Sequence, residues 1–140
     1  MPSPSDIVRE FCSAFPTRDL ATIERLLDDS AVYHNVGMEP AVGKDASLAS
    51  IKAFFDMFES MEFKILALAA DGDTVLTERT DALTVDGVAA PVPVMGAFEV
   101  RDGRIVAWRD YFDMGLVGRL MAGEAVDPAL LPSVTPTGQP

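Results

Sequence analysis

In the second half of the chain, three Asp-Gly pairs separate segments in which apolar and polar residues alternate. Alternation at a period of two is typical of a β-strand, and Asp-Gly is a favoured sequence for the tight turn of a β-hairpin. The pairs are Asp71-Gly72, Asp86-Gly87 and Asp102-Gly103. They predict an antiparallel meander, with strands at approximately 61–70, 73–84, 89–100 and 104–112.

Before residue 60 the period is different, because apolar residues recur every three or four positions, as on one face of a helix. The elements expected there are a helix capped by Ser3 or Ser5 and ended by Pro16, a short helix over 20–27, a strand over 31–36, a loop over 37–43 and a helix from Lys44. A last short helix is expected over 114–122. Helices followed by an antiparallel sheet predict an α+β domain.

The length and charge of the chain limit its function. A chain of 140 residues forms one globular domain, expected over 1–125, and the Pro-rich tail over 126–140 is expected to be extended. The formal net charge of −11 opposes binding to nucleic acid or to an anionic membrane surface, so neither is an expected partner. There is no signal-peptide pattern and no apolar run long enough to span a membrane, so a cytoplasmic protein is expected.

Charged side chains fall on the apolar face of two of the expected strands. In one strand Arg79 and Asp81 share a face, and in the last strand Asp110 lies on the face of Trp108 and Phe112. A carboxylate on such a face is strongly destabilising unless it is paired or hydrogen-bonded. The pattern therefore favours an arginine placed between two aspartates.

The turn lengths predict how these residues align across the strands. A two-residue loop at Asp86-Gly87 places Arg79 opposite Val94. A three-residue loop ending at Gly103 then places Val94 opposite Asp110. A buried network of this kind has two interpretations. It can be a structural cluster whose charges only pair with one another, or it can be part of a catalytic site.

Tyr33 and Asn35 lie two residues apart and so share a face of the short strand over 31–36. Their phenol and amide groups could together hold one water molecule. His34, between them, is expected to face away and to be a surface residue.

Three short motifs follow one another along the chain: Tyr-X-Asn at 33–35, Thr-Glu-Arg-X-Asp at 77–81 and Trp-Arg-Asp-Tyr-Phe-Asp at 108–113. In their order and spacing they resemble the limonene-1,2-epoxide hydrolase family, over nearly the whole chain before the tail. The resemblance implies a curved, mixed or antiparallel sheet with three to four helices that close a cone-shaped pocket. This NTF2-like, or cystatin-like, fold is shared with ketosteroid isomerase and SnoaL-like proteins, and the family usually forms homodimers.

The resemblance also implies a reaction, in which water adds to a small apolar epoxide, cyclic or terpene-like, in one step to give a vicinal diol. It implies Asp81 as the acid, Asp110 as the base, Arg79 as a bridge between them, and Tyr33 and Asn35 as ligands of the water. Two carboxyls suit this chemistry, because a protonated one can donate a proton while an ionised one accepts one. No covalent intermediate, cofactor or metal is expected.

The pocket around these groups is expected to be apolar, with candidate lining residues Leu83, Val92, Val94, Phe112, Phe15, Phe54 and Phe58. Two other functions stay open. One is an isomerase or polyketide cyclase of the same fold, with a single aspartate as base. The other is a non-catalytic small-ligand-binding module in which the polar cluster is only structural.

Overall fold

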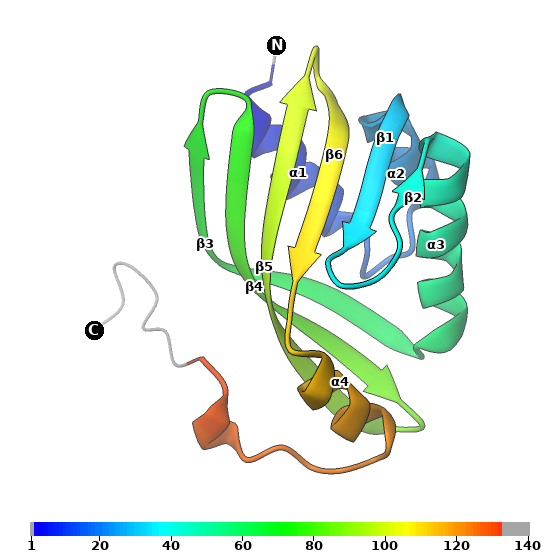
Figure 1. Ribbon diagram of the computed structural model, residues 1–140, viewed down its shortest axis with the longest axis vertical. Coiled ribbons are helices and arrows are strands. Elements are labelled where there is room, and N and C mark those ends of the chain that lie inside the picture. Colours follow the sequence, from blue (N-terminus) through cyan, green and yellow to red (C-terminus); the bar gives the residue numbers. More distant parts are fainter. Residues whose placement is uncertain (1, 133–140) are drawn as a thin grey trace.

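The computed structural model describes residues 2–132, and Figure 1 shows an α+β fold with helices and strands in mixed order. The helices are α1 (Pro4–Ser13), α2 (Leu20–Leu26), α3 (Lys44–Met57), α4 (Met114–Met121) and the short 3₁₀ helix η1 (Pro128–Leu130). The strands are β1 (Leu27–Asn35), β2 (Ala41–Val42), β3 (Ser60–Asp71), β4 (Thr74–Val85), β5 (Val88–Arg101) and β6 (Arg104–Tyr111). Every helix and strand expected from the sequence is present, with small shifts at the ends.

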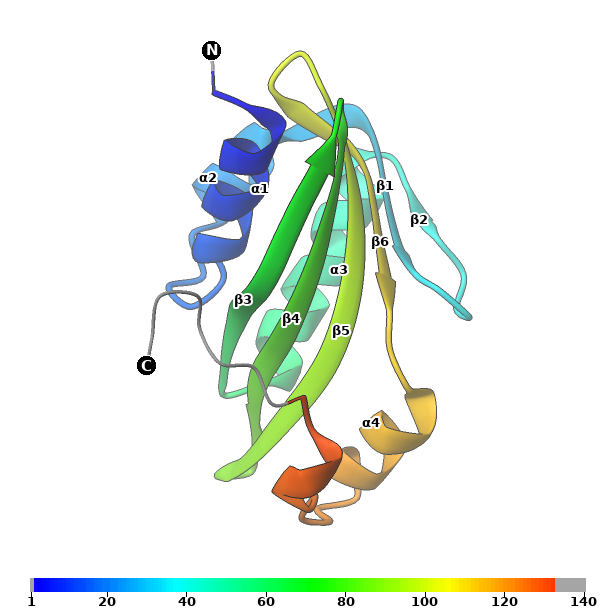
Figure 2. The ribbon, with the colours of Figure 1, turned by 90° about the vertical axis from the view of Figure 1, so that its left-hand side faces the viewer.

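The strands form one sheet in the order β2-β1-β6-β5-β4-β3. Strands β3 to β6 are the expected antiparallel meander, whereas β1 pairs with β6 in parallel, a pairing that the sequence did not predict. The segment expected to be only a loop over 37–43 contains β2, which pairs with β1. The sheet is curved, and Figure 2 shows α1 and α2 on one side of it, which we call the inner face.

The helices are held against the inner face by apolar side chains. Ser3 caps α1, because its hydroxyl accepts from the backbone of Asp6 while the Asp6 carboxylate accepts from the backbone of Ser3. Phe11 and Phe15 follow on the buried side and contact the ring of Trp108 edge to face. Among residues 2–132, no helix combines the length and the apolar character needed to cross a membrane.

The C-terminal part beyond β6 begins with α4, which packs against the first half of β5. Its buried Leu120 lies in one apolar cluster with Ala90, Val92 and Val94. Asp113 caps this helix by accepting hydrogen bonds from Gly115 and Leu116. The first part of the expected Pro-rich tail contains η1, and residues 133–140 of that tail lie outside the described residues.

The hairpin turns set the register of the meander. At Asp86-Gly87 both residues have positive φ, at 50° and 77°, and Val85 pairs with Val88 across a two-residue loop. This is the expected turn, and it places Arg79 opposite Val94 as predicted. The first turn is shifted by one residue, because Asp71 pairs with Thr74 and leaves Gly72-Asp73 as the loop.

A turn forms at Asp102-Gly103 as predicted, but its predicted length of three residues is wrong. Both residues have positive φ, at 52° and 76°, so the loop has two residues and Arg101 pairs with Arg104. The pairing then shifts between Glu99 and Val100, where β6 accommodates one extra residue. Asp110 therefore lies opposite Gly96 and not opposite Val94. The inner face is preserved, because Gly96 and Val94 are two residues apart.

Gly96 leaves a gap in the inner face of β5, between Thr77 of β4 and Asp110 of β6. A Cβ atom added at Gly96 would collide with Arg79 Nη1 and lie 2.7 Å from Asp110 Oδ1. The missing side chain is thus what allows the guanidinium of Arg79 to cross β5 toward β6.

Replacing Gly96 tests this packing. Gly96→Ala is expected to lower the free energy of unfolding by about 1–3 kcal/mol, the usual cost of overpacking a close-packed interior. Gly118→Ala in α4 is the matched control, because an added Cβ meets nothing within 4 Å there, and alanine favours a helix over glycine by up to about 1 kcal/mol. Urea denaturation measures both, and equal stability of the two variants would contradict the packing argument.

Candidate active site

The site is built around Arg79, whose side chain is completely buried on the inner face. Its Nε and Nη2 atoms donate hydrogen bonds of 3.0 Å to Asp81, one to each carboxylate oxygen. Its Nη1 and Nη2 atoms donate to the two oxygens of Asp110, at 3.1 and 2.9 Å. One guanidinium therefore binds two carboxylates in bidentate fashion, and the structure brings together the three residues that strand alternation placed on one face.

The remaining contacts of Arg79 fix its plane. Nη1 also donates to Thr77 Oγ1 at 3.2 Å, so each of the five N–H groups of the guanidinium has an acceptor. The guanidinium carbon lies 4.8 Å from the centroid of the Phe63 ring, a cation–π contact. Arg79 thus has little freedom to move relative to the two aspartates.

Burial and charge act in opposite directions on this cluster. Burial raises the pKa of Asp81 from 3.8 to about 6, although the nearby charge of Arg79 lowers it. Burial also disfavours the charged form of Arg79, but Asp110 and Asp81 together hold the pKa of Arg79 well above its usual value. The cluster can therefore keep a proton on Asp81 at mildly acidic pH while Arg79 stays charged.

Tyr33 and Asn35 reach the cluster through the parallel pairing of β1 with β6. The register places Tyr33 beside Trp108 and Asn35 beside Asp110. Asn35 Nδ2 donates to the Tyr33 hydroxyl at 3.1 Å, so the phenol and the amide are neighbours, as expected from their spacing. Burial raises the pKa of Tyr33 well above its usual value, which keeps the hydroxyl protonated.

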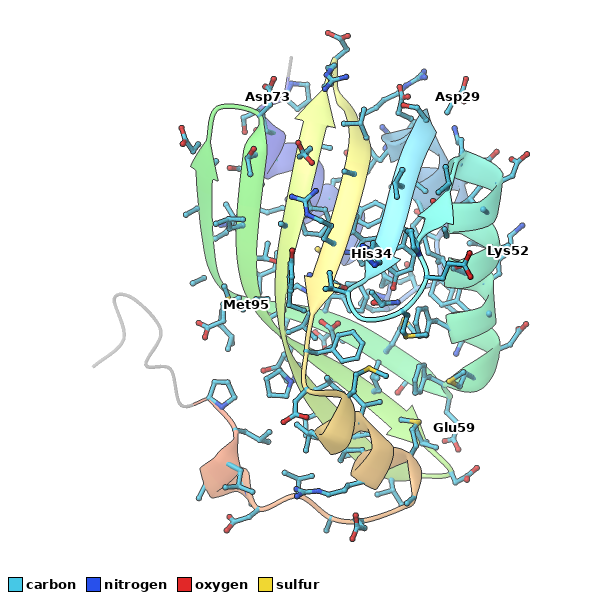
Figure 3. The ribbon with its side chains drawn as sticks, in the orientation of Figure 1. Asp29, His34, Lys52, Glu59, Asp73 and Met95 are labelled. Carbon is cyan, nitrogen blue, oxygen red and sulfur yellow. The ribbon has the colours of Figure 1, made fainter. Side chains whose placement is uncertain are left out.

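The other face of the sheet takes no part in the cluster. Figure 3 shows His34 and Met95 on the side of the sheet that faces away from α1. His34 thus faces away from the site, as expected, and its Nε2 atom lies 2.8 Å from the carbonyl oxygen of Met38. Glu78 pairs with Met95 across the strands and lies on the same outer face.

The polar cluster opens into a cavity of about 90 Å³ with almost entirely apolar walls. Asp81, Asp110, Tyr33 and Asn35 line it, and Arg79 lies behind the two carboxylates. All of the expected apolar residues line it as well, namely Leu83, Val92, Val94, Phe112, Phe15, Phe54 and Phe58. Within residues 2–132, no three His, Cys, Asp or Glu side chains lie close enough together to bind a metal ion.

Several residues of the site were not predicted. Met61, Phe63 and Val117 also line the cavity. Alternation along β3 could have placed Met61 and Phe63 on the inner face, whereas nothing in the sequence indicates where α4 packs. The hydrogen bonds that Thr77 and Trp108 make within the cluster were missed too, although both residues have the correct alternation.

Comparison with known proteins identifies relatives of the whole arrangement. Residues 2–120 match the family described as the limonene-1,2-epoxide hydrolase catalytic domain. The chain is 40% identical over 107 residues to the epoxide hydrolase EphG of Mycobacterium tuberculosis, covering 76% of this chain and 71% of that protein.

Two solved structures extend the comparison. An epoxide hydrolase from M. tuberculosis, of the same limonene-1,2-epoxide hydrolase-like type, superposes with a TM-score of 0.70 at 35% identity, over 84% of this chain and 94% of that one. A protein of ketosteroid isomerase-like fold from Catenulispora acidiphila has a TM-score of 0.76 at 18% identity, over 94% and 100% of the two chains, and shows the shared fold alone. The expected fold is thereby confirmed, and the chain belongs to the limonene-1,2-epoxide hydrolase family.

Proposed function

We propose that this protein is an epoxide hydrolase that adds water to a small apolar epoxide, cyclic or terpene-like, and releases a vicinal diol. One observation supports this most directly: Arg79 holds Asp81 and Asp110 side by side at the wall of an apolar cavity, next to Tyr33 and Asn35. The match to an epoxide hydrolase at 40% identity supports the same reaction.

In the proposed step, Asp110 is the base and Asp81 is the acid. Asp110 takes a proton from water as the water oxygen bonds to an epoxide carbon. The bond between that carbon and the epoxide oxygen breaks, and Asp81 gives its proton to the departing oxygen. The cycle is complete when a proton returns from Asp110 to Asp81, and Arg79 Nη2 contacts both carboxylates at 2.9 and 3.0 Å.

The attacking water is proposed to lie between Asp110, Tyr33 and Asn35. The backbone register supports this placement, because Asn35 is the direct neighbour of Asp110 across β1 and β6. The neutral Tyr33 hydroxyl and the amide of Asn35 can each hydrogen-bond a water molecule and aim its lone pair at the epoxide.

The substrate is proposed to be apolar because the cavity wall offers few polar groups besides the site itself. Aromatic rings surround the space, among them Phe54 of α3, Phe58 just after that helix and Phe112 just after β6. An epoxide with further polar groups would leave them without partners, which is costly in a dry pocket.

Removing either carboxyl tests the acid and base assignment. Asp81→Asn and Asp110→Asn are each expected to lower kcat at least about 100-fold on a simple cyclic epoxide, the range for losing a general acid or base. Glu78→Gln, on the outer face, is the control and should keep its activity. Near-normal turnover of a folded aspartate variant would contradict the assignment.

The proposed role of Tyr33 is tested in the same assay. Tyr33→Phe should lower kcat with little change in KM, because the phenol is proposed to hold water and not substrate.

The raised pKa of Asp81 predicts a pH dependence. The acid must be protonated to donate, so kcat/KM should fall as the pH rises through about 6.

The raised pKa of Asp81 also makes stability depend on pH. Because the folded-state pKa lies above the unfolded value, the stability contributed by this group is fully present below pH 3.8 and is lost as the pH rises through about 6. Melting temperatures across this pH range should therefore decline more steeply for the wild type than for Asp81→Asn. Parallel curves for the two proteins would contradict the raised pKa of Asp81.

Isotope labelling tests whether the reaction proceeds in one step. In a single turnover in water labelled with ¹⁸O, direct attack by water places the label in the diol during the first cycle. Attack by an aspartate would give an unlabelled diol first and leave the label in an enzyme carboxylate. Mass spectrometry of the diol and of the digested protein distinguishes the two, and label found in Asp81 or Asp110 would rule out the one-step mechanism.

A further inference from the structure

Trp108 makes a hydrogen bond to the proposed base that has no role in the mechanism above. Its Nε1 donates to Asp110 Oδ1 at 2.8 Å, and Arg79 Nη1 donates to the same oxygen at 3.1 Å. The other oxygen, Oδ2, accepts from Arg79 Nη2 at 2.9 Å. A carboxylate oxygen accepts about two hydrogen bonds in its plane, so Oδ1 is filled while Oδ2 keeps one free position.

The indole ring is held rigidly, so the direction of its N–H is fixed. Trp108 is only 1% exposed. One face stacks on the ring of Tyr33 with centroids 4.0 Å apart and planes at 14°, and the ring of Phe98 is stacked at 5.7 Å and 12°. Phe11 contacts the indole edge to face at 5.1 Å. The same ring therefore contacts the base through its N–H and a proposed water ligand through its face.

We propose that Trp108 is a positioning residue that selects Asp110 Oδ2 as the atom that receives the proton of the attacking water. By filling Oδ1 it leaves one acceptor position on the base, and by stacking on Tyr33 it keeps the phenol in register with that position. This inference rests on the proposed epoxide hydrolysis. In the step, the O–H bond of water breaks, the proton passes to Oδ2, and the water oxygen bonds to the epoxide carbon.

The groups around Asp110 define what a pH profile can report. Arg79 and Asp81 of β4 and Tyr33 of β1 face it, and Cys12 approaches from α1. Burial raises the pKa of Cys12 to about 12 and that of Tyr33 well above its usual value, so both stay neutral in the working range. The low-pH limb of a kcat/KM profile is thus assigned to the base, and the high-pH limb to Asp81.

A single-atom change in the indole tests the proposal. The chain has one tryptophan, so growth of a tryptophan auxotroph on benzothienylalanine replaces Trp108 alone and exchanges its N–H for sulfur in a ring of nearly the same shape. Without the N–H that orients the base, Asp110 is expected to be misplaced, and kcat should fall about 10- to 100-fold with KM little changed, the range for a small misplacement of a catalytic group. The carboxylate should also become easier to protonate, so the low-pH limb should move to higher pH.

Fluorotryptophan provides a change of opposite sign. Fluorination makes the indole N–H a stronger donor and preserves the fold-determining ring, so the low-pH limb should move to lower pH. This variant keeps the test decisive if the sulfur analogue does not fold. A merely structural tryptophan would change stability in both proteins without moving the limb in either direction.

An NMR measurement tests the hydrogen bond independently of turnover. With ¹⁵N labelling the chain gives one indole resonance, which should move in Asp110→Asn and stay unchanged in Glu78→Gln. A wild-type protein without epoxide hydrolase activity would contradict the proposed function. An indole resonance that does not move in Asp110→Asn would contradict the hydrogen bond itself. A folded benzothienylalanine protein with unchanged kcat and an unchanged pH profile would overturn the role of Trp108.

Discussion

The guanidinium of Arg79 is the interaction on which the rest of the site depends. Two carboxylates can remain on an apolar face only because this one group supplies hydrogen bonds to all four of their oxygens. Removing one partner from such a buried cluster leaves an uncompensated charge, at a cost of about 3–5 kcal/mol. The requirement extends to the backbone, because the guanidinium fits across β5 only where Gly96 has no side chain.

The same fold supports unrelated chemistry, so the shape of the sheet does not by itself give a function. The match to a ketosteroid isomerase-like structure at 18% identity shows this shared architecture. In the present chain, the two aspartates of the site have different hydrogen-bond partners. Asp81 receives hydrogen bonds from Arg79, whereas Asp110 receives them from both Arg79 and Trp108. This asymmetry favours different protonation states for two chemically identical groups.

Local patterns made much of this structure predictable. Asp-Gly pairs marked the hairpins, and alternation alone placed Arg79 and Asp81 on one face. The register of Asp110 was missed because the last loop has two residues instead of the expected three, and because the extra residue in β6 has no glycine or proline to mark it. The pairing of β1 with β6 was missed because no turn joins these two strands. The spacing of Tyr33 and Asn35 suggested that they could share a water molecule, but it did not show which aspartate would lie beside them.

The pairing of β1 with β6 also determines when the site can form. Hairpins within β3 to β6 close short loops, whereas Asn35 and Asp110 are separated by most of the described chain, and closing so long a loop costs more conformational entropy. During synthesis from the N-terminus, β1 can pair with β6 only after nearly the whole domain has left the ribosome. The pocket is therefore complete only in a fully translated domain, and a truncated chain that ends before β6 contains Arg79 and Asp81 but lacks Asp110 and Trp108.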